Sequence, residues 1–371
     1  MVSRPAATTG NAGLVAVAPP PAWAGFRPLR VTAVEPESST IASVRLADPD
    51  GQPVPAPLPG QFLTVRLQPD AEQPPLIRSY SLSGPPDGGD YRISVKQEPH
   101  GVASGYLHAR VHPGDLIDVA APRGTFVLRP ASTPVLLISG GVGATPMLAM
   151  LYALAAQRSE REVWWLQAAR DGEDRPFATE TAELLAGLPH ARSQIFYSRP
   201  RAQDHGYDRA GRLSLTALRA LRVPLDADAY LCGPAGFLTD VTAALVEVGV
   251  PADRISTEIF GAGPGITPGI SAVVTRAPHP PAGEPGDGPA VSFARSGLTV
   301  PWADGRDSLL ELAEACDVPV RWSCRSGVCH TCETGLLSGE VAYTTEPVDP
   351  PADGDVLICS SRPRGAVVLD L

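Results

Sequence analysis

The chain has 371 residues, of which 43% are hydrophobic and 19% charged, and its formal net charge is −10. This length predicts two or three domains, and the composition excludes a chain that is disordered throughout. Forty acidic residues outnumber thirty basic ones and no basic cluster occurs, which argues against a nucleic-acid partner.

Targeting signals are the next feature that the sequence limits. No stretch approaches about 18 consecutive apolar residues, the length that a membrane-spanning helix needs. The apolar run at 13–18 leads directly into three prolines, which a secretory signal does not do. The sequence therefore predicts a cytoplasmic protein with no membrane partner. Residues 290–371 hold twelve acidic and six basic residues, an excess that either steers a basic partner or covers a solvated surface.

The first 132 residues predict a barrel after a short leading segment. Residues 1–25 are small, polar or proline-rich, and we expect a disordered N-terminal segment there. Residues 26–132 contain six or seven short alternating runs, separated by turn clusters such as 48–51 and 85–89 and interrupted by one helical stretch. Short strands at this spacing predict a small closed antiparallel barrel.

The pattern of apolar residues changes after residue 132. In residues 133–261 buried strand patterns alternate with helical stretches, which predicts a parallel sheet with crossover helices. Residues 262–289 are rich in proline and glycine and are expected to form a linker. Residues 290–371 combine strand-like ends with one amphipathic helix and a cysteine-rich loop, and they predict a third compact domain.

The cysteines give the strongest chemical signal. They are Cys232, Cys316, Cys324, Cys329, Cys332 and Cys359. The close triple Cys324, Cys329 and Cys332 with the distant Cys359 has the spacing of plant-type 2Fe–2S sites, and Gly327 lets backbone amides approach the sulfurs. A four-thiolate zinc site is the alternative, but zinc sites of this kind normally use two CxxC pairs and this loop has one. Cys316 lies on the amphipathic helix and is expected to be a buried core thiol.

A glycine-rich turn gives the second signal. It follows an apolar strand and opens a helix, a context in which backbone amides and the helix N-terminus bind phosphate. Its candidate residues are Gly141, Val142, Gly143, Ala144, Thr145 and Pro146. Pro146 leaves the dinucleotide fingerprint incomplete. A second strand-end turn, Cys232, Gly233 and Pro234, strengthens the prediction because ligands bind at the carboxyl ends of parallel strands.

Two stretches of the predicted barrel give the third signal. In the strand Arg78, Ser79, Tyr80 and Ser81, an arginine can bind phosphate, an aromatic ring can pack on a flat heterocycle, and a hydroxyl can bond a ring nitrogen. The small residues Gly101, Val102, Ala103 and Ser104 then offer backbone amides to a pyrophosphate. The alternative for the first stretch is an ordinary alternating strand with one tyrosine.

Six segments in order carry a resemblance to a known family: 59–62, 78–83, 94–108, 140–147, 230–237 and 257–261. The chain resembles the ferredoxin–NADP reductase superfamily, in the form joined to a C-terminal plant-type ferredoxin. The resemblance covers about residues 26–371. The first two domains are similar to the reductase half of bacterial flavohaemoglobins, and the domain order resembles oxygenase reductases of the phthalate and vanillate type.

The resemblance implies a multi-domain fold. It consists of a six-stranded antiparallel Greek-key β-barrel for FAD at 26–132, an α/β parallel-sheet nucleotide-binding domain at 133–261, and a β-grasp 2Fe–2S ferredoxin domain at 290–371.

The resemblance also implies residue roles. Arg78, Tyr80 and Ser81 would hold the flavin together with Ser79 and Phe62, and 101–104 would follow its phosphates. The turn at 141–146 would hold the nicotinamide nucleotide, with Cys232, Gly233 and Pro234 at the nicotinamide. Glu258 and Phe260 would lie against the isoalloxazine ring. The expected catalytic residues are Ser81, Cys232, Glu258 and Phe260, and the expected cluster ligands are Cys324, Cys329, Cys332 and Cys359.

The implied function is that of an NAD(P)H-dependent electron-transfer reductase. Electrons from the nicotinamide nucleotide would pass through FAD to the 2Fe–2S cluster and on to an external protein acceptor, such as an oxygenase or a haem monooxygenase. The alternatives are a stand-alone NAD(P)H oxidase or dye reductase, a ferredoxin-like carrier whose reductase half serves only for docking, and a zinc-stapled structural protein.

Departures from the family limit the implied function. No globin domain precedes residue 26, so nitric oxide dioxygenation by this chain alone is not expected, and a missing or separately encoded upstream domain stays open. FAD is favoured over FMN by the 100–104 stretch. NADH is favoured over NADPH, although Arg199 and Arg201 could bind a 2′-phosphate.

Overall fold

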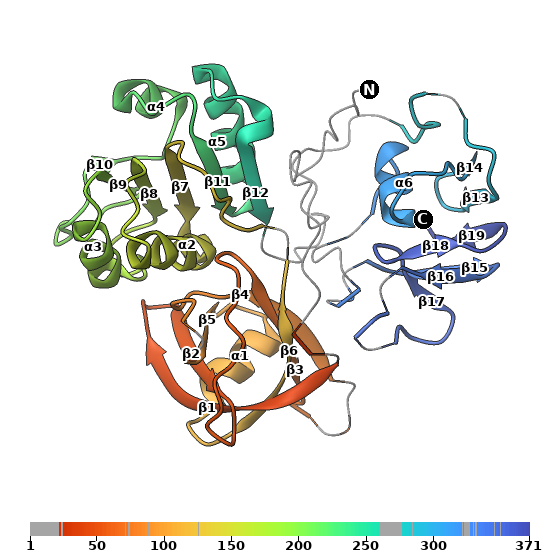
Figure 1. The fold of residues 1–371 in the computed structure, drawn as a ribbon, viewed down its shortest axis with the longest axis horizontal. Helices are drawn as coiled ribbons and strands as arrows, with labels where there is room; N and C mark the ends of the chain where they lie inside the picture. Colours follow the sequence, from red (N-terminus) through yellow and green to blue (C-terminus); the bar gives the residue numbers. More distant parts are fainter. Residues whose placement is uncertain are drawn as a thin grey trace. The chain divides into compact units, whose positions relative to one another are not determined.

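The computed structural model describes residues 22–23, 25–70, 72, 75–87, 89–124, 126–259, 277–283, 285–320, 322, 327–328, 330, 332–344, 346–348 and 350–371. Within these residues the chain separates into two compact units, 22–259 and 277–371 (Figure 1). Most of the predicted N-terminal segment and the first part of the predicted linker, 262–276, lie outside the described residues. No described helix is long and apolar enough to cross a membrane.

The first sheet of the larger unit is antiparallel and has six strands in the order β4-β3-β6-β1-β2-β5. An isolated bridge pairs Leu82, directly after β4, with Ile93 on β5, so the two outer strands of the sheet meet as in a barrel. Helix α1 (Val102–Ala109) packs Ala103 and Leu107 into the barrel core. The strands are β1 (Phe26–Pro36), β2 (Ile41–Ala47), β3 (Phe62–Leu67), β4 (Leu76–Ser81), β5 (Tyr91–Lys96) and β6 (Leu116–Arg123).

The second sheet is parallel, in the order β10-β9-β8-β7-β11-β12. Every residue of β7 is buried, as expected for a strand with helices on both faces. Leu137 of this strand packs with α2 and α3, whereas Leu136 packs with α4 and α5. The strands are β7 (Val135–Gly140), β8 (Val163–Ala169), β9 (Ala191–Tyr197), β10 (Arg209–Ala210), β11 (Asp228–Gly233) and β12 (Ile255–Ile259). The helical elements are η1 (Gly141–Gly143), α2 (Ala144–Ala156), α3 (Ala178–Ala186), α4 (Leu215–Leu221), α5 (Ala235–Val248) and η2 (Ala252–Arg254).

The smaller unit contains a mixed five-stranded sheet, in the order β14-β13-β19-β15-β17, and a short two-stranded sheet of β16 and β18. Helix α6 (Leu309–Ala315) buries leucines in the same core as β13 and β19. Residues 277–289, part of the predicted linker, pack on this unit, where His279 bonds Asp317 and Gly288 donates to Trp302. The strands are β13 (Ala290–Phe293), β14 (Leu298–Pro301), β15 (Glu333–Ser338), β16 (Val341–Tyr343), β17 (Asp355–Leu357), β18 (Ser361–Pro363) and β19 (Val367–Leu369). The predicted multi-domain fold class is confirmed by these three sheet architectures.

Candidate active site

The turn between β7 and α2 is built from backbone. Gly141 has a φ of +57° with open space beside it. A Cβ on Gly143 would overlap the carbonyl oxygen of Cys232 on the neighbouring strand, so only glycine fits there. Within the described residues no side chain caps α2, and its first turn has no acidic residue. The Ala144 amide donates to the carbonyls of Gly141 and Val142 and Pro146 has no N–H, so the turn that precedes the helix is the part that offers amides to an anion. This turn fits a nucleotide pyrophosphate.

The predicted residues of this turn do not all lie at its surface. Gly141 and Val142 are partly exposed, whereas Ala144, Thr145 and Pro146 are buried. The Thr145 hydroxyl donates to the carbonyl of Val142 (3.0 Å) and so stabilises the turn itself. Gly141 and Val142 are therefore the residues of this turn that are open to a ligand.

Cys232 lies at the carboxyl end of β11, fully buried. It is paired in register with Ser139 on one side and Glu258 on the other, so the three side chains form a row on one face of the sheet. Burial raises the pKa of the Cys232 thiol well above its usual value, and the Glu258 carboxyl adds to this. The thiol is therefore neutral at pH 7. Next in the chain, Gly233 lies close to Gly140, and Pro234 is the N-cap residue of α5.

Ser139 is the residue in this row that the sequence argument passed over. Its hydroxyl is 1% exposed and has no hydrogen-bond partner among the described residues. A buried hydroxyl without a partner is costly, so it marks a place where a ligand can supply the missing bond. The sequence signal was only its position directly before the glycines of the turn.

The barrel meets this row through Ser81. The Ser81 hydroxyl donates to Glu258 Oε2 at 3.0 Å, a bond between residues 177 positions apart. Burial raises the pKa of Glu258 to about 8, and the bond from Ser81 opposes this rise. Near neutral pH the Glu258 carboxyl therefore keeps its proton. Phe260 lies outside the described residues, so its expected position is not described.

The other flavin candidates lie along β3 and β4. Phe62 pairs with Ser81 and contacts Gly124, and it is buried. Burial raises the pKa of the half-buried Tyr80 to about 12, so its phenol stays neutral. The Ser79 hydroxyl bonds Thr64 (2.9 Å). Arg78 is exposed, and its guanidinium donates to the carbonyl of Ile77 (2.7 Å).

The N-terminus of α1 is the expected phosphate stretch. Gly101 caps the helix, and Val102, its first residue, is 66% exposed. Ser104 accepts a bond from the Glu98 amide and donates to the Gly101 carbonyl, each at 3.1 Å. Ser104 thus stabilises the loop with its own side chain, Ala103 is buried in the core, and the first amides of the helix remain for an anion. This arrangement fits a flavin phosphate.

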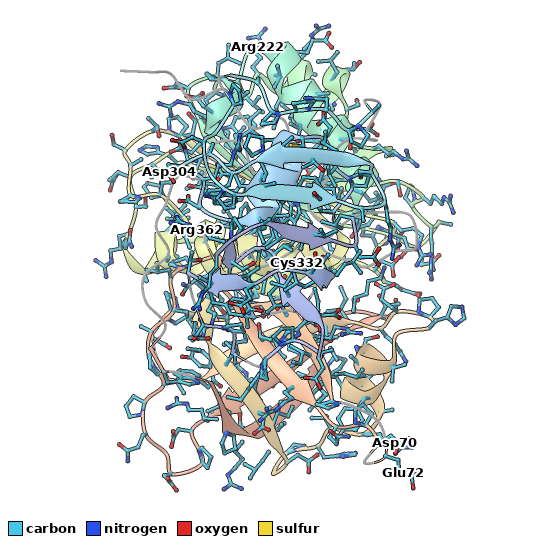
Figure 2. All side chains as sticks on the ribbon, turned by 90° about the vertical axis from the view of Figure 1, so that its right-hand side faces the viewer. Asp70, Glu72, Arg222, Asp304, Cys332 and Arg362 are labelled. Atoms are coloured by element: carbon cyan, nitrogen blue, oxygen red, sulfur yellow. The ribbon has the colours of Figure 1, made fainter. Side chains whose placement is uncertain are left out.

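The smaller unit holds the cysteine site. Cys332 is 3% and Cys359 is 8% exposed, and Cys332 lies beside the strands of this unit (Figure 2). Cys324 and Cys329 lie outside the described residues. Gly327, with a φ of +68°, donates its amide to Cys359 Sγ at 3.3 Å. An amide donated to a buried cysteine sulfur is the environment that an iron–sulfur cluster needs, so these residues fit the cluster.

Comparison with family models identifies the three parts. Residues 28–128 match the oxidoreductase FAD-binding domain, 137–243 the oxidoreductase NAD-binding domain, and 291–364 the 2Fe-2S iron-sulfur cluster binding domain. The predictions of FAD, a nicotinamide nucleotide and a 2Fe–2S cluster as cofactors are therefore confirmed.

Individual relatives cover different shares of the chain. A flavohemoprotein of Deinococcus radiodurans is 42% identical over 254 residues, 68% of this chain and 63% of the relative. The chain thus spans under two thirds of that protein. The FAD/NAD-binding domain of nitric oxide dioxygenase from Vibrio cholerae is 36% identical, with a TM-score of 0.57, over 64% of this chain and all of that chain. Phthalate dioxygenase reductase is 27% identical over 94% of this chain and 98% of that chain, with a TM-score of 0.55.

The predicted relationship is confirmed by the order of the three domain matches and by the coverage of these relatives. The chain belongs to the ferredoxin–NADP reductase superfamily, as an FAD- and NAD-binding oxidoreductase that carries a 2Fe–2S domain.

Proposed function

We propose that this protein takes electrons from NADH and delivers them to a separate oxygenase or haem protein. When bound, the nicotinamide nucleotide supplies two electrons as a hydride, FAD accepts them, and the 2Fe–2S cluster carries electrons singly to the acceptor. The observation that carries the proposal is the Ser81–Glu258 contact, which links the FAD-binding barrel to the carboxyl end of the nucleotide-binding sheet.

The residues of the nucleotide-binding sheet have distinct tasks in this proposal. The amides at Gly141 and Val142 bind the pyrophosphate. Cys232 offers a small, uncharged surface to the nicotinamide, and the Ser139 hydroxyl bonds a polar group of the coenzyme. Glu258 holds a proton on its carboxyl near neutral pH, 3.0 Å from the Ser81 hydroxyl. The carboxyl is therefore uncharged and places no negative charge beside the flavin.

The barrel residues bind and orient the flavin. Tyr80 offers an uncharged ring, Ser81 a hydroxyl, and Arg78 a cation with Ser79 beside it. Phe62 supports the paired strand. The backbone amides of the first turn of α1, which begins at Val102, bind phosphate. In the smaller unit, the cluster is bound by Cys324, Cys329, Cys332 and Cys359. In the larger unit, Phe260 is proposed to cover the flavin until the nicotinamide replaces it.

Arginine pairing favours NADH over NADPH. The pyrophosphate turn follows β7 and the contact with the barrel is on β12, so the adenosine end points toward β8 and β9, on the other side of β7. In that region Arg201 donates to Asp171 (3.0 Å) and also pairs with Glu173, and Arg170 donates to Asp174 (2.6 Å). At Arg170 and Arg201 a 2′-phosphate would have to displace these carboxylates, which favours the coenzyme without it. Arg199, the other predicted candidate, is exposed and has no carboxylate partner among the described residues.

The coenzyme preference gives the first prediction. We expect kcat/KM for NADH to exceed that for NADPH by at least tenfold, since about 1.4 kcal/mol of unfavourable phosphate binding suffices for that ratio. The double substitution Asp171→Asn with Glu173→Gln frees Arg201 and should narrow the ratio. An unchanged ratio would contradict the assigned role of these carboxylates.

The acceptor class rests on relatives. Phthalate dioxygenase reductase, which matches nearly the whole chain, is described as a modular structure for electron transfer from pyridine nucleotides to 2Fe–2S. A separate oxygenase is therefore the acceptor that we propose for this chain.

An anaerobic titration of the purified protein tests the electron path. NADH should bleach the flavin absorbance and produce the EPR signal of a reduced cluster. The variant Cys359→Ser should lose the EPR signal completely while the flavin still bleaches, because the thiolate ligand of the cluster is gone and the reductase unit is intact. If wild-type flavin does not bleach, the proposed function is wrong; if only the cluster stays silent, a stand-alone oxidase or dye reductase is the better reading.

A further inference from the structure

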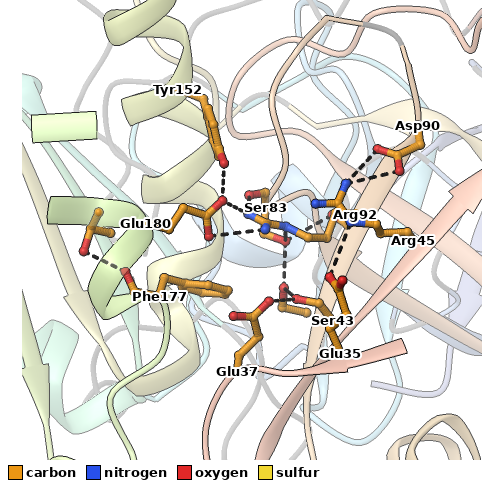
Figure 3. Close-up of polar contacts among 12 residues, drawn as sticks. Glu35, Glu37, Ser43, Arg45, Ser83, Asp90, Arg92, Tyr152, Phe177 and Glu180 are labelled. Atoms are coloured by element: carbon orange, nitrogen blue, oxygen red, sulfur yellow. Dashed lines mark hydrogen bonds and ion pairs between the residues drawn. The ribbon is translucent and has the colours of Figure 1, made fainter. Parts of the chain in front are cut away.

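A buried arginine joins the barrel to the helices of the nucleotide-binding domain, at a point separate from the Ser81–Glu258 contact. Arg92 lies on β5 and is 4% exposed, and Glu180 lies on α3. Arg92 Nη1 donates to Glu180 Oε2 (3.2 Å) and Nη2 to Oε1 (2.8 Å), a two-bonded pair that Figure 3 shows from the side. A planar guanidinium that makes both bonds fixes the orientation of its partner as well as its distance.

The nucleotide-binding side of this pair is held by two aromatic residues. The Tyr152 hydroxyl on α2 donates to Glu180 Oε1. The Arg92 guanidinium lies over the rings of Tyr152 and Phe177, 6.0 and 5.5 Å from their centroids. Because Phe177 caps α3, both α2 and the start of α3 fix the position that Arg92 occupies.

The barrel side of the pair is a chain of buried hydroxyls. Arg92 Nε donates to the Ser83 hydroxyl (3.2 Å), and Nη2 donates to the Ser83 carbonyl. The Ser83 hydroxyl bonds Ser94 (2.7 Å), which bonds Ser43 (2.7 Å), and Ser43 donates to Glu37 (2.5 Å). The guanidinium is thus tied to the backbone and side chain of Ser83 and, through them, to strand β2.

Ser83 is two residues from Ser81, whose hydroxyl bonds Glu258. The nucleotide-binding domain therefore holds the short stretch 81–83 at two points, directly from Glu258 on β12 and through Arg92 from Glu180 on α3. With one contact alone the barrel edge could rotate about that contact, whereas two contacts from different elements fix its orientation.

We propose that Arg92 and Glu180 are positioning residues for hydride transfer, which seat the barrel so that Ser81 stays against Glu258. The inference rests on the proposed function. Neither residue belongs to the turn at 141–143 that binds the nucleotide, so loss of the pair slows the transfer step and leaves nucleotide affinity nearly unchanged.

The variant Glu180→Gln tests this on the full-length protein with FAD bound, because glutamine keeps the shape and removes the charge. We expect flavin bleaching by saturating NADH in an anaerobic stopped-flow experiment to slow by roughly ten- to a hundredfold per bound FAD. The NADH concentration at half-maximal rate should change little. Amide hydrogen exchange at 81–83, measured without NADH, should become faster.

The matched control is Asp90→Asn. Both carboxylate oxygens of Asp90 accept from a single nitrogen of Arg45, Nη1, at 3.2 Å each, so this is also an arginine–carboxylate pair, but both of its residues belong to the barrel. This variant should keep the wild-type rate. An equal rate in Glu180→Gln and Asp90→Asn would overturn the proposal, and so would a slow Glu180→Gln variant whose exchange at 81–83 matches the wild type.

If Glu180→Gln does not fold, Tyr152→Phe is used in its place, since it removes only the hydroxyl that bonds Glu180. It should slow bleaching by roughly two- to fivefold, the effect of one hydrogen bond, and an unchanged rate would overturn the proposal. If the flavin of the wild-type protein does not respond to NADH, the proposed function is wrong. The variants test only the positioning role, because each is compared with the wild-type rate.

Discussion

In the larger unit, two regions bring distant parts of the chain into close contact in different ways. The turn after β7 is built from backbone, where Gly143 lies so close to Cys232 that no side chain fits. The boundary between barrel and nucleotide-binding sheet is built from side chains, Ser81 with Glu258 and Arg92 with Glu180, 177 and 88 positions apart. A backbone-built site tolerates almost no substitution, whereas a side-chain-built boundary should lose its function in graded steps.

The largest effect should come from Gly143→Val. Its side chain would overlap the Cys232 carbonyl, which is backbone and cannot move aside. We expect a loss of about 3 kcal/mol in the free energy of unfolding and no flavin bleaching by NADH. Urea unfolding and anaerobic bleaching measure the two effects.

Gly141→Ala is the matched control for that variant. Its position has a positive φ but open space, so alanine should cost only about 1 kcal/mol of backbone strain. If both glycine variants behaved alike, the distinction between overlap and strain would be wrong.

The side-chain boundary is tested next by Glu258→Gln. The folded-state pKa of about 8 lies above the usual 4.5, so the folded protein binds a proton that the unfolded chain has released. Stability conferred by this group is therefore full below about pH 4.5 and is lost as the pH rises toward 8. Glutamine is always neutral, so the variant should lack this decline.

Urea unfolding at pH 5 and pH 9 checks the Glu258 prediction. The difference in unfolding free energy between the two pH values should be larger for the wild type than for Glu258→Gln, by a few kcal/mol at most. Equal pH dependence in the two proteins would show that Glu258 ionises normally.

The same contrast explains what the sequence could predict. The glycines, the buried strand before them and the cysteine spacing are local patterns, and they predicted the phosphate-binding turn and the 2Fe–2S site. FAD and the named fold of each domain were implied by the family resemblance. The Arg92–Glu180 pair gave no such signal, because an arginine on an alternating strand and a glutamate in the first turn of a helix look like ordinary surface residues. Only the packing of two domains brings them together and removes them from water.

Ser139 combines features of both regions, because it contributes a side chain to the site that is otherwise built from backbone. Its substitution gives the smallest predicted effect. Its hydroxyl is buried without a partner among the described residues, so Ser139→Ala should raise the unfolding free energy of the protein without coenzyme by about 1 kcal/mol. If the hydroxyl bonds the coenzyme, the same variant should weaken NADH binding by roughly two- to tenfold. Thermal unfolding and an NADH titration measure the two changes. A variant that is more stable and binds NADH normally would make Ser139 a packing residue, since the missing partner would then not be the coenzyme.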